Sequence, residues 1–174
     1  MARIQPAAAA TKEAEKVFRE IEGAFGMVPN LFKTYAVHPP LLEANWNKVK
    51  AVMMEGSLSG KVKQSIAVLV SKDNGCQYCV AAHRGALKAI GVSDEELRQI
   101  EENVAKADFT AKEKALIDFA RKANRAPLSI TDADFAAVKQ TGASDAEIIE
   151  ALGVMEVFTS FNKFLDSLQV AIDF

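Results

Sequence analysis

The sequence is poor in cysteine, histidine and tryptophan, and it contains no long hydrophobic run. Its 174 residues include two cysteines, two histidines and one tryptophan. No apolar stretch approaches the roughly 20 residues that a membrane-spanning helix needs, and residues 1–10 lack the apolar core of a secretory signal peptide. We therefore expect no membrane partner and a cytoplasmic location, where close cysteines are more often catalytic or metal-binding than structural.

Neither sign of charge is in surplus. Lys and Arg number 21 and Asp and Glu number 23, which leaves a formal net charge of −2. Nucleic acids and anionic surfaces are bound through a basic surplus that this chain does not have, so we expect no nucleic-acid partner. The 49% of hydrophobic residues is ordinary for a soluble globular protein, and the length suits a single domain, 1–174.

Strand-like alternation of apolar and polar residues is also absent, and apolar residues recur at helical spacing instead. Ser or Thr followed three residues later by Glu predicts capping boxes at Ser93, Thr110 and Ser144. Single caps are expected at Ser59 and Thr131. These signals predict an all-α fold. The expected helices span 7–21, 29–36, 40–54, 60–73, 76–90, 94–103, 111–124, 132–141 and 145–170.

One segment recurs within the chain. Residues 91–97 are matched 51 residues later by 142–148, and three lysines, one isoleucine and one alanine match at the same offset. A constant offset suggests a duplicated helical unit, although capping chemistry also recurs independently. The resulting division is 1–57 for the N-terminal helices, 58–108 for a cysteine-bearing unit and 109–174 for a second unit. In the second unit the two cysteines and the following histidine are replaced by Pro127, Ile130 and Asp134.

The residues that could carry chemistry gather in one stretch, 75–83. Cys76 and Cys79 are the only cysteines, and His83 follows Cys79 by four residues. On a helix that begins near Cys76, these spacings place the three side chains on one face. A helix N-terminus favours the thiolate form of cysteine, and a Cys-x-x-Cys pair closes a disulfide with little backbone movement.

Three interpretations of this stretch stay open from the residues alone. In a redox dithiol, one thiolate attacks a peroxide oxygen, the second thiol condenses with the sulfenic acid, and His83, whose imidazole titrates near neutral pH, takes the thiol proton. As three ligands with an open fourth position, the residues would resemble a catalytic zinc site, although Cys-x-x-Cys is only half of a typical zinc pattern. Buried cysteines also serve as inert packing.

The stretch and its surroundings resemble a known family. The resemblance rests on Lys63-Gln64-Ser65-Ile66-Ala67 and Gly75-Cys76-Gln77-Tyr78-Cys79-Val80-Ala81-Ala82-His83, and further on residues 26–32, the His38-Pro39 turn and Phe161-Asn162-Lys163. These motifs are similar to those of the alkylhydroperoxidase AhpD / carboxymuconolactone decarboxylase family, in its peroxidase-related branch, and they cover nearly the whole chain. The resemblance implies an all-α fold of two duplicated helical units, assembly into homo-oligomers, and reduction of a hydroperoxide substrate by a cysteine pair, a peroxiredoxin activity that needs no cofactor or metal.

The resemblance also implies a role for each site residue. Peroxide would oxidise Cys79, Cys76 would complete a disulfide, and a dithiol reductant or a reductase protein would reduce it. His83 would belong to a proton relay with a glutamate twelve residues before the first cysteine, where this chain has Gln64. A glutamine positions a water but does not accept a proton at neutral pH, so we expect a slow peroxidase. Alternatively, Gln64 is only a polar residue on a helix face, because its neighbours Lys61 and Lys63 are expected to be solvated.

Two other functions stay open. Relatives that share the fold without a thiol pair are cofactor-free, decarboxylase-like enzymes, and a thiol pair without turnover would serve a redox-sensing or zinc-holding module. The last expected helix is apolar on all sides, which predicts burial against another subunit and therefore a homo-oligomer. The residues that crowd it are Phe158, Phe161, Phe164 and Leu165.

Overall fold

The computed structural model describes residues 2–7 and 11–174, and within these residues it contains helices and no strand. The all-α prediction is therefore confirmed. The α-helices of the described residues are α1 (Glu15–Phe25), α2 (Asn30–Tyr35), α3 (Pro39–Val49), α4 (Gly60–Asn74), α5 (Gln77–Ala89), α6 (Asp94–Glu102), α7 (Ala111–Arg125), α8 (Asp132–Gln140) and α9 (Asp145–Leu168). Short helices of other types cover Lys50–Met54, Val104–Lys106 and Pro127–Ser129. None of the helices in this part of the chain is both long and apolar enough to cross a membrane.

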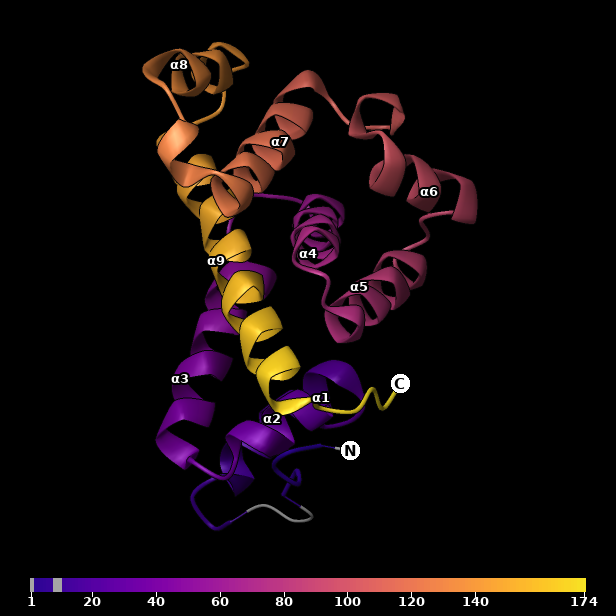
Figure 1. Cartoon of the computed structure of the whole chain (residues 1–174), viewed down its shortest axis with the longest axis vertical. Helices are drawn as coiled ribbons and strands as arrows, with labels where there is room; N and C mark the ends of the chain where they lie inside the picture. Colours follow the sequence, from indigo (N-terminus) through magenta and orange to yellow (C-terminus); the bar gives the residue numbers. More distant parts are fainter. Residues whose placement is uncertain (1, 8–10) are drawn as a thin grey trace.

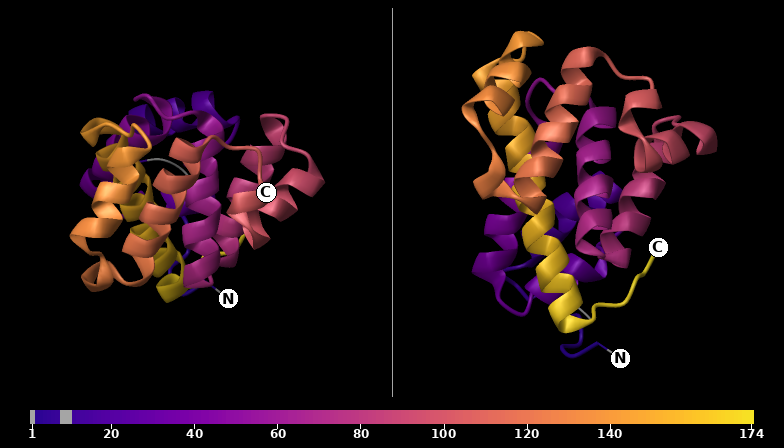
Figure 2. Two further views of the ribbon diagram at one scale, coloured as in Figure 1. Left: turned by 90° about the horizontal axis from the view of Figure 1, so that it is seen from above. Right: turned by 45° about the horizontal axis from the view of Figure 1, so that its top comes forward.

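Two helices form the centre of the molecule. α4 packs against α5, α7 and α9, and α9 also contacts the π-helix that follows α3. α1 and α2 lie near one end of α9, and α8 lies near the other (Figure 1). The C-terminal segment leaves the end of α9 and runs toward α5, a course that a second direction of view confirms (Figure 2). The fold thus brings the C-terminal segment close to the start of α5, which carries the cysteines.

The first helix begins later than the sequence predicts. Of the expected helix 7–21, residues 8–10 lie outside the described part, and the chain makes a turn before α1. The N–H of Ala7 donates to the carbonyl of Lys33 at 3.0 Å, which ties this residue to α2. α1 ends only at Gly26, whose φ of 75° is the left-handed conformation that glycine adopts at helix ends.

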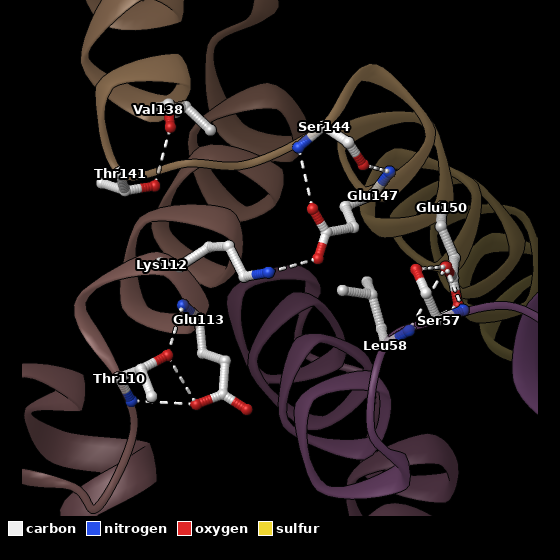
Figure 3. Close-up of polar contacts among 10 residues, drawn as sticks. All are labelled: Ser57, Leu58, Thr110, Lys112, Glu113, Val138, Thr141, Ser144, Glu147 and Glu150. Carbon is white, nitrogen blue, oxygen red and sulfur yellow. Dashed lines mark hydrogen bonds and ion pairs between the residues drawn. The ribbon is translucent and has the colours of Figure 1, made fainter.

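Polar caps set the starts of the later helices. Ser93, Thr110 and Ser144 each accept a hydrogen bond from the backbone N–H three residues later. At Thr110 and Ser144 the glutamate at that position bonds back to the cap, which completes a capping box (Figure 3). The capping box predicted at Ser93 is wrong, because the side chain of Glu96 pairs with Lys61 on α4 and makes no return bond.

Several features recur at the offset of the sequence repeat. α4 and α7 have the same length and begin 51 residues apart. The ion pair between Lys61 of α4 and Glu96 has a counterpart between Lys112 of α7 and Glu147, whose Nζ and Oε1 atoms lie 2.5 Å apart (Figure 3). These matches support the proposal of a duplicated helical unit.

Lys63 is buried, so the expectation that it is solvated is wrong. Its side chain is 3% exposed, its Nζ lies 2.7 Å from a carboxylate oxygen of Glu150 on α9, and it also donates to the Glu55 carbonyl. The same carboxylate accepts the N–H groups of Ser57 at 2.9 Å and Leu58 at 3.2 Å (Figure 3). Removal of either buried charge would leave the other unpaired. The hydrogen bonds to Ser57 and Leu58 also attach the loop that leads into α4 to Glu150 on α9.

The aromatic residues of α9 are covered by their own chain. Phe158, Phe161 and Leu165 are 6%, 2% and 1% exposed, and Phe164 stacks on Tyr35 with ring centroids 3.9 Å apart. These residues therefore need no second subunit to shield them from water. Assembly into a homo-oligomer stays a prediction.

Candidate active site

A glycine turn delivers the two cysteines to the start of α5. Gly75 ends α4 with a φ of 80°, a conformation that other residues rarely adopt, and Cys76 is then the N-cap of α5. Cys79 lies in the first turn, and His83 follows one turn later on the same face. Both cysteines are free and buried, with exposed fractions of 0% for Cys76 and 3% for Cys79.

The two thiols form a coupled pair in which Cys76 ionises first. A hydrogen bond from the Cys79 thiol lowers the pKa of Cys76, and its place at the helix N-terminus also favours a thiolate. The same contact is the largest cause that raises the pKa of Cys79, followed by burial and the charge of Cys76. The singly ionised pair therefore shares one proton, and Cys79 becomes the thiolate when that proton moves to Cys76.

Two buried polar side chains accompany Cys79. Ser71 and Asn162 are both 0% exposed. The amide nitrogen of Asn162 donates to the Ser71 hydroxyl at 3.0 Å, and the amide oxygen accepts from Asn74 at 3.0 Å. The second amide hydrogen of Asn162 and the hydroxyl hydrogen of Ser71 are not used in these contacts and can be donated. Hydrogen bonds from these two side chains lower the pKa of Cys79. They oppose the larger effects of Cys76 and of burial, so they favour a thiolate at Cys79.

His83 and Gln64, which the sequence assigns to one relay, are in direct contact. His83 Nδ1 lies 2.6 Å from Gln64 Oε1. Because an amide oxygen only accepts hydrogen bonds, Nδ1 carries the proton and Nε2 keeps the lone pair that a base needs. Phe158 packs edge-on against the imidazole, with ring centroids 4.2 Å apart. Gln64 therefore has a specific partner inside the site and is not simply a polar residue on a solvated face.

The apolar surroundings keep His83 neutral. Burial lowers its pKa from 6.5 to about 3, so the expectation that this imidazole titrates near neutral pH is wrong. Gln64 accepts the Nδ1 hydrogen but carries no charge that would stabilise the imidazolium. His83 consequently holds an added proton only transiently, which weakens it as a base.

His83 should make the folded protein sensitive to acid. Since its folded pKa of about 3 lies below the ordinary 6.5, the unfolded chain binds a proton that the folded chain does not, and stability is lost as the pH falls from 6.5 toward 3. The loss is about 5 kcal/mol over the whole interval. Denaturant unfolding of the wild type and of His83→Gln measures it, and any stability advantage of the wild type should shrink from pH 7 to pH 4. An advantage that stays constant would contradict a buried, neutral imidazole.

An apolar pocket opens on Cys79. Its volume is about 500 Å³, which is in the range of small-molecule sites. Among the described residues Cys76 does not line it, so a bound molecule meets Cys79 and not Cys76. The pocket therefore gives access to Cys79, whereas the lower pKa belongs to Cys76. Transfer of the shared proton from Cys79 to Cys76 makes the accessible cysteine the thiolate. The polar or reactive side chains in the lining are Gln64, Tyr78, Cys79 and His83.

The zinc interpretation finds no support in the geometry. Cys76, Cys79 and His83 do not assemble into a metal-binding group, and no three Cys, His, Asp or Glu side chains do so within residues 2–7 and 11–174. His83 is bonded to Gln64 through Nδ1, which leaves one nitrogen for other contacts.

Sequence reasoning assigned no role in the site to Ser71 or Asn162, although Asn162 belongs to one of the motifs that carry the resemblance. The two residues lie on α4 and α9, 91 residues apart, so no local spacing links them to the cysteines. The available signal was polarity at positions where the surrounding residues are apolar and buried. A polar side chain at such a position needs a hydrogen-bonding partner, and here that partner belongs to the site.

The central part of the chain matches a known family. Residues 39–122 match the model of the Carboxymuconolactone decarboxylase family. This segment contains both cysteines, His83 and Gln64. A search of the curated proteins gave no significant match.

Solved structures extend the likeness to the whole chain. A peroxidase-related protein from Silicibacter sp. TM1040 is 27% identical with a TM-score of 0.87, over 99% of this chain and 92% of its own. A peroxidase-related protein from Ralstonia eutropha JMP134, described as an alkylhydroperoxidase AhpD core, gives the same values. The debrominase Bmp8 in complex with 2,3,4-tribromopyrrole, 20% identical with a TM-score of 0.84 over 98% of this chain and 91% of its own, shares the fold. Residues 39–122 are thus similar to the carboxymuconolactone decarboxylase family, and over its full length the chain has the AhpD-like fold.

Proposed function

We propose that this protein is a thiol-dependent peroxidase that reduces hydroperoxides through a disulfide cycle of Cys79 and Cys76. The observation that carries the proposal is the placement of the pair: Cys79 opens into an apolar pocket, and Cys76 stands next to it at the N-cap of α5. The family and the structural neighbours named for peroxidases and for AhpD support it.

The cycle begins with a thiolate at Cys79. The pair loses one proton, and the remaining shared proton moves to Cys76. The Cys79 sulfur then attacks the terminal oxygen of the hydroperoxide, so that an S–O bond forms as the O–O bond breaks. The alcohol oxygen leaves with the bonding electrons and takes up the proton that the pair released, which His83 relays through Nε2. The product at Cys79 is a sulfenic acid.

Cys76 completes the cycle. Cys76 gives up the proton that it received, its thiolate attacks the Cys79 sulfur, and an S–S bond forms as the S–O bond breaks. The hydroxide that leaves takes up that proton to become water. An external dithiol then supplies two electrons and two protons and restores both thiols. The short Cys-x-x-Cys spacing suits this closure, because the two sulfurs meet with little backbone movement.

Asn162 should tune the reactivity of Cys79. In a Cys76→Ser background Cys79 is the single thiol, and Asn162→Leu removes a donor to its thiolate. The pKa of Cys79 should rise, and alkylation by iodoacetamide at neutral pH should slow about tenfold. The matched control is Asn124→Leu, because Asn124 bonds to Asn74 in the same polar network and lies two contacts further from the sulfur than Asn162. Equal slowing in both variants would contradict a direct effect of Asn162.

Steady-state turnover tests the proposed function. With dithiothreitol as reductant, the wild type should consume many equivalents of cumene hydroperoxide per chain. Consumption no faster than with the Cys76→Ser, Cys79→Ser double variant would contradict a thiol peroxidase. Decarboxylation of a lactone substrate that survives in the double variant would favour the decarboxylase-like alternative instead.

A further inference from the structure

The segment after α9 folds back across the site. α9 ends at Gln169, which has a left-handed φ of 52°. Val170 is buried, and its N–H bonds to the carbonyl of Leu165 at 3.1 Å. From there the segment runs without regular structure toward the start of α5, as both figures of the whole chain show (Figures 1 and 2). We call residues 169–174 the C-terminal strap.

Asp173 fastens the C-terminal strap to two elements of the site. Its Oδ1 accepts the hydroxyl of Tyr78, the residue directly before Cys79, at 2.9 Å. Its Oδ2 accepts the backbone N–H of Asn30 at 2.8 Å, and the Asn30 side chain donates to the carbonyl of Ala171 at 3.1 Å. One carboxylate thus joins the strap to α2 and to the cysteine turn.

Phe174 forms part of the pocket wall beside Cys79. Its ring meets the Tyr78 ring edge-on, with centroids 5.0 Å apart, and it lines the same pocket as Cys79. The residue is nevertheless 53% exposed, and Phe25 in the same lining is 47% exposed. An apolar group that enters the pocket would remove these ring surfaces from water, which favours binding.

We propose that the C-terminal strap selects the substrate: Asp173 holds it in place, and Phe174 favours hydroperoxides that carry a bulky apolar or aromatic group over hydrogen peroxide. This inference rests on the proposed peroxidase function. Hydrogen peroxide is too small to contact the distant walls of a pocket of about 500 Å³, whereas a phenyl group packs against aromatic side chains. Phe174 is thus a specificity residue, and Asp173 positions it.

The test compares cumene hydroperoxide with hydrogen peroxide. Phe174→Ala and Asp173→Ala should each lower the ratio of the two kcat/KM values about tenfold, through a higher KM for cumene hydroperoxide. Ile172→Ala is the matched control, because Ile172 is a half-exposed apolar residue of the same strap, and the ratio should change less than twofold. A ratio that is unchanged in Phe174→Ala would overturn the inference.

A second measurement separates this inference from the proposed function. The Cys79→Ser protein is titrated calorimetrically with 2-phenyl-2-propanol, the alcohol product of cumene hydroperoxide. Binding that weakens about tenfold on addition of Phe174→Ala supports the strap as an apolar-ligand site. This conclusion would hold even if the wild type turned over neither peroxide. Absence of turnover would defeat the proposed function alone. Turnover without any effect of Phe174→Ala on the ratio or on alcohol binding overturns the strap alone. If Phe174→Ala changes the oligomeric state and leaves the ratio of the two kcat/KM values unchanged, this face is a contact between copies of the chain. That result would also overturn the inference about the strap.

Discussion

Replacing Cys79 by Ser should abolish hydroperoxide turnover, with a loss in kcat/KM of about 10³-fold or more. Cys79 is the cysteine that lines the pocket, so no other thiol of the chain can reach a bound peroxide. A serine hydroxyl is a far weaker nucleophile at neutral pH, and the neutral His83 beside it is a weak base. Initial rates with cumene hydroperoxide and excess dithiothreitol measure the effect.

The matched variant Cys76→Ser should behave differently. It should consume about one equivalent of hydroperoxide per chain and then stop as a sulfenic acid that dimedone traps at Cys79. Its first attack should not be blocked, because the contact with Cys76 is the largest cause that raises the pKa of Cys79. A dimedone adduct on Cys76 in a Cys79→Ser protein, with the peroxide consumed, would reverse the two roles.

Replacing Gln64 by Glu should raise peroxide turnover about tenfold. Gln64 Oε1 lies 2.6 Å from His83 Nδ1, so a carboxylate at this position would stabilise the imidazolium and raise the pKa of His83. His83 would then accept the thiol proton more readily at neutral pH. The variant should also lose activity at acidic pH, where the imidazole becomes protonated, and a pH–rate profile of kcat/KM measures both effects.

The matched control for Gln64→Glu is Gln77→Glu. Gln77 is an exposed residue in the first turn of α5. The Gln77→Glu substitution therefore adds the same negative charge without contacting His83. Its rate should change less than twofold. A rate that is unchanged or lower in Gln64→Glu would contradict the view that the missing charge limits the relay.

Local signals predicted the parts of the fold that local chemistry decides. Thr110 and Ser144 start their helices with capping boxes, and Ser59 caps α4 by accepting the N–H of Val62. These residues act within a few positions along the chain, so their patterns are visible in the sequence. The same is true of Cys76 and Cys79, which are held by one turn of one helix.

Contacts between distant segments decided the rest. Lys63 looked solvated because it stands next to other polar residues, but Glu150 on α9 gives it a buried partner. The pKa of His83 depends on how completely apolar side chains surround it, which helical spacing does not reveal. Asp173 reaches Tyr78 across 95 residues, so the strap had no local signature.

The measurement that tests the peroxidase cycle most directly is the mass of the intact chain after one turnover without reductant. One equivalent of hydroperoxide should remove two hydrogen atoms, eliminate both free thiols and leave a disulfide between Cys76 and Cys79, the two free cysteines of the chain. Addition of dithiothreitol should restore the original mass and both thiols. A chain that keeps both thiols, or that gains oxygen at Cys79 without forming the disulfide, would contradict the account.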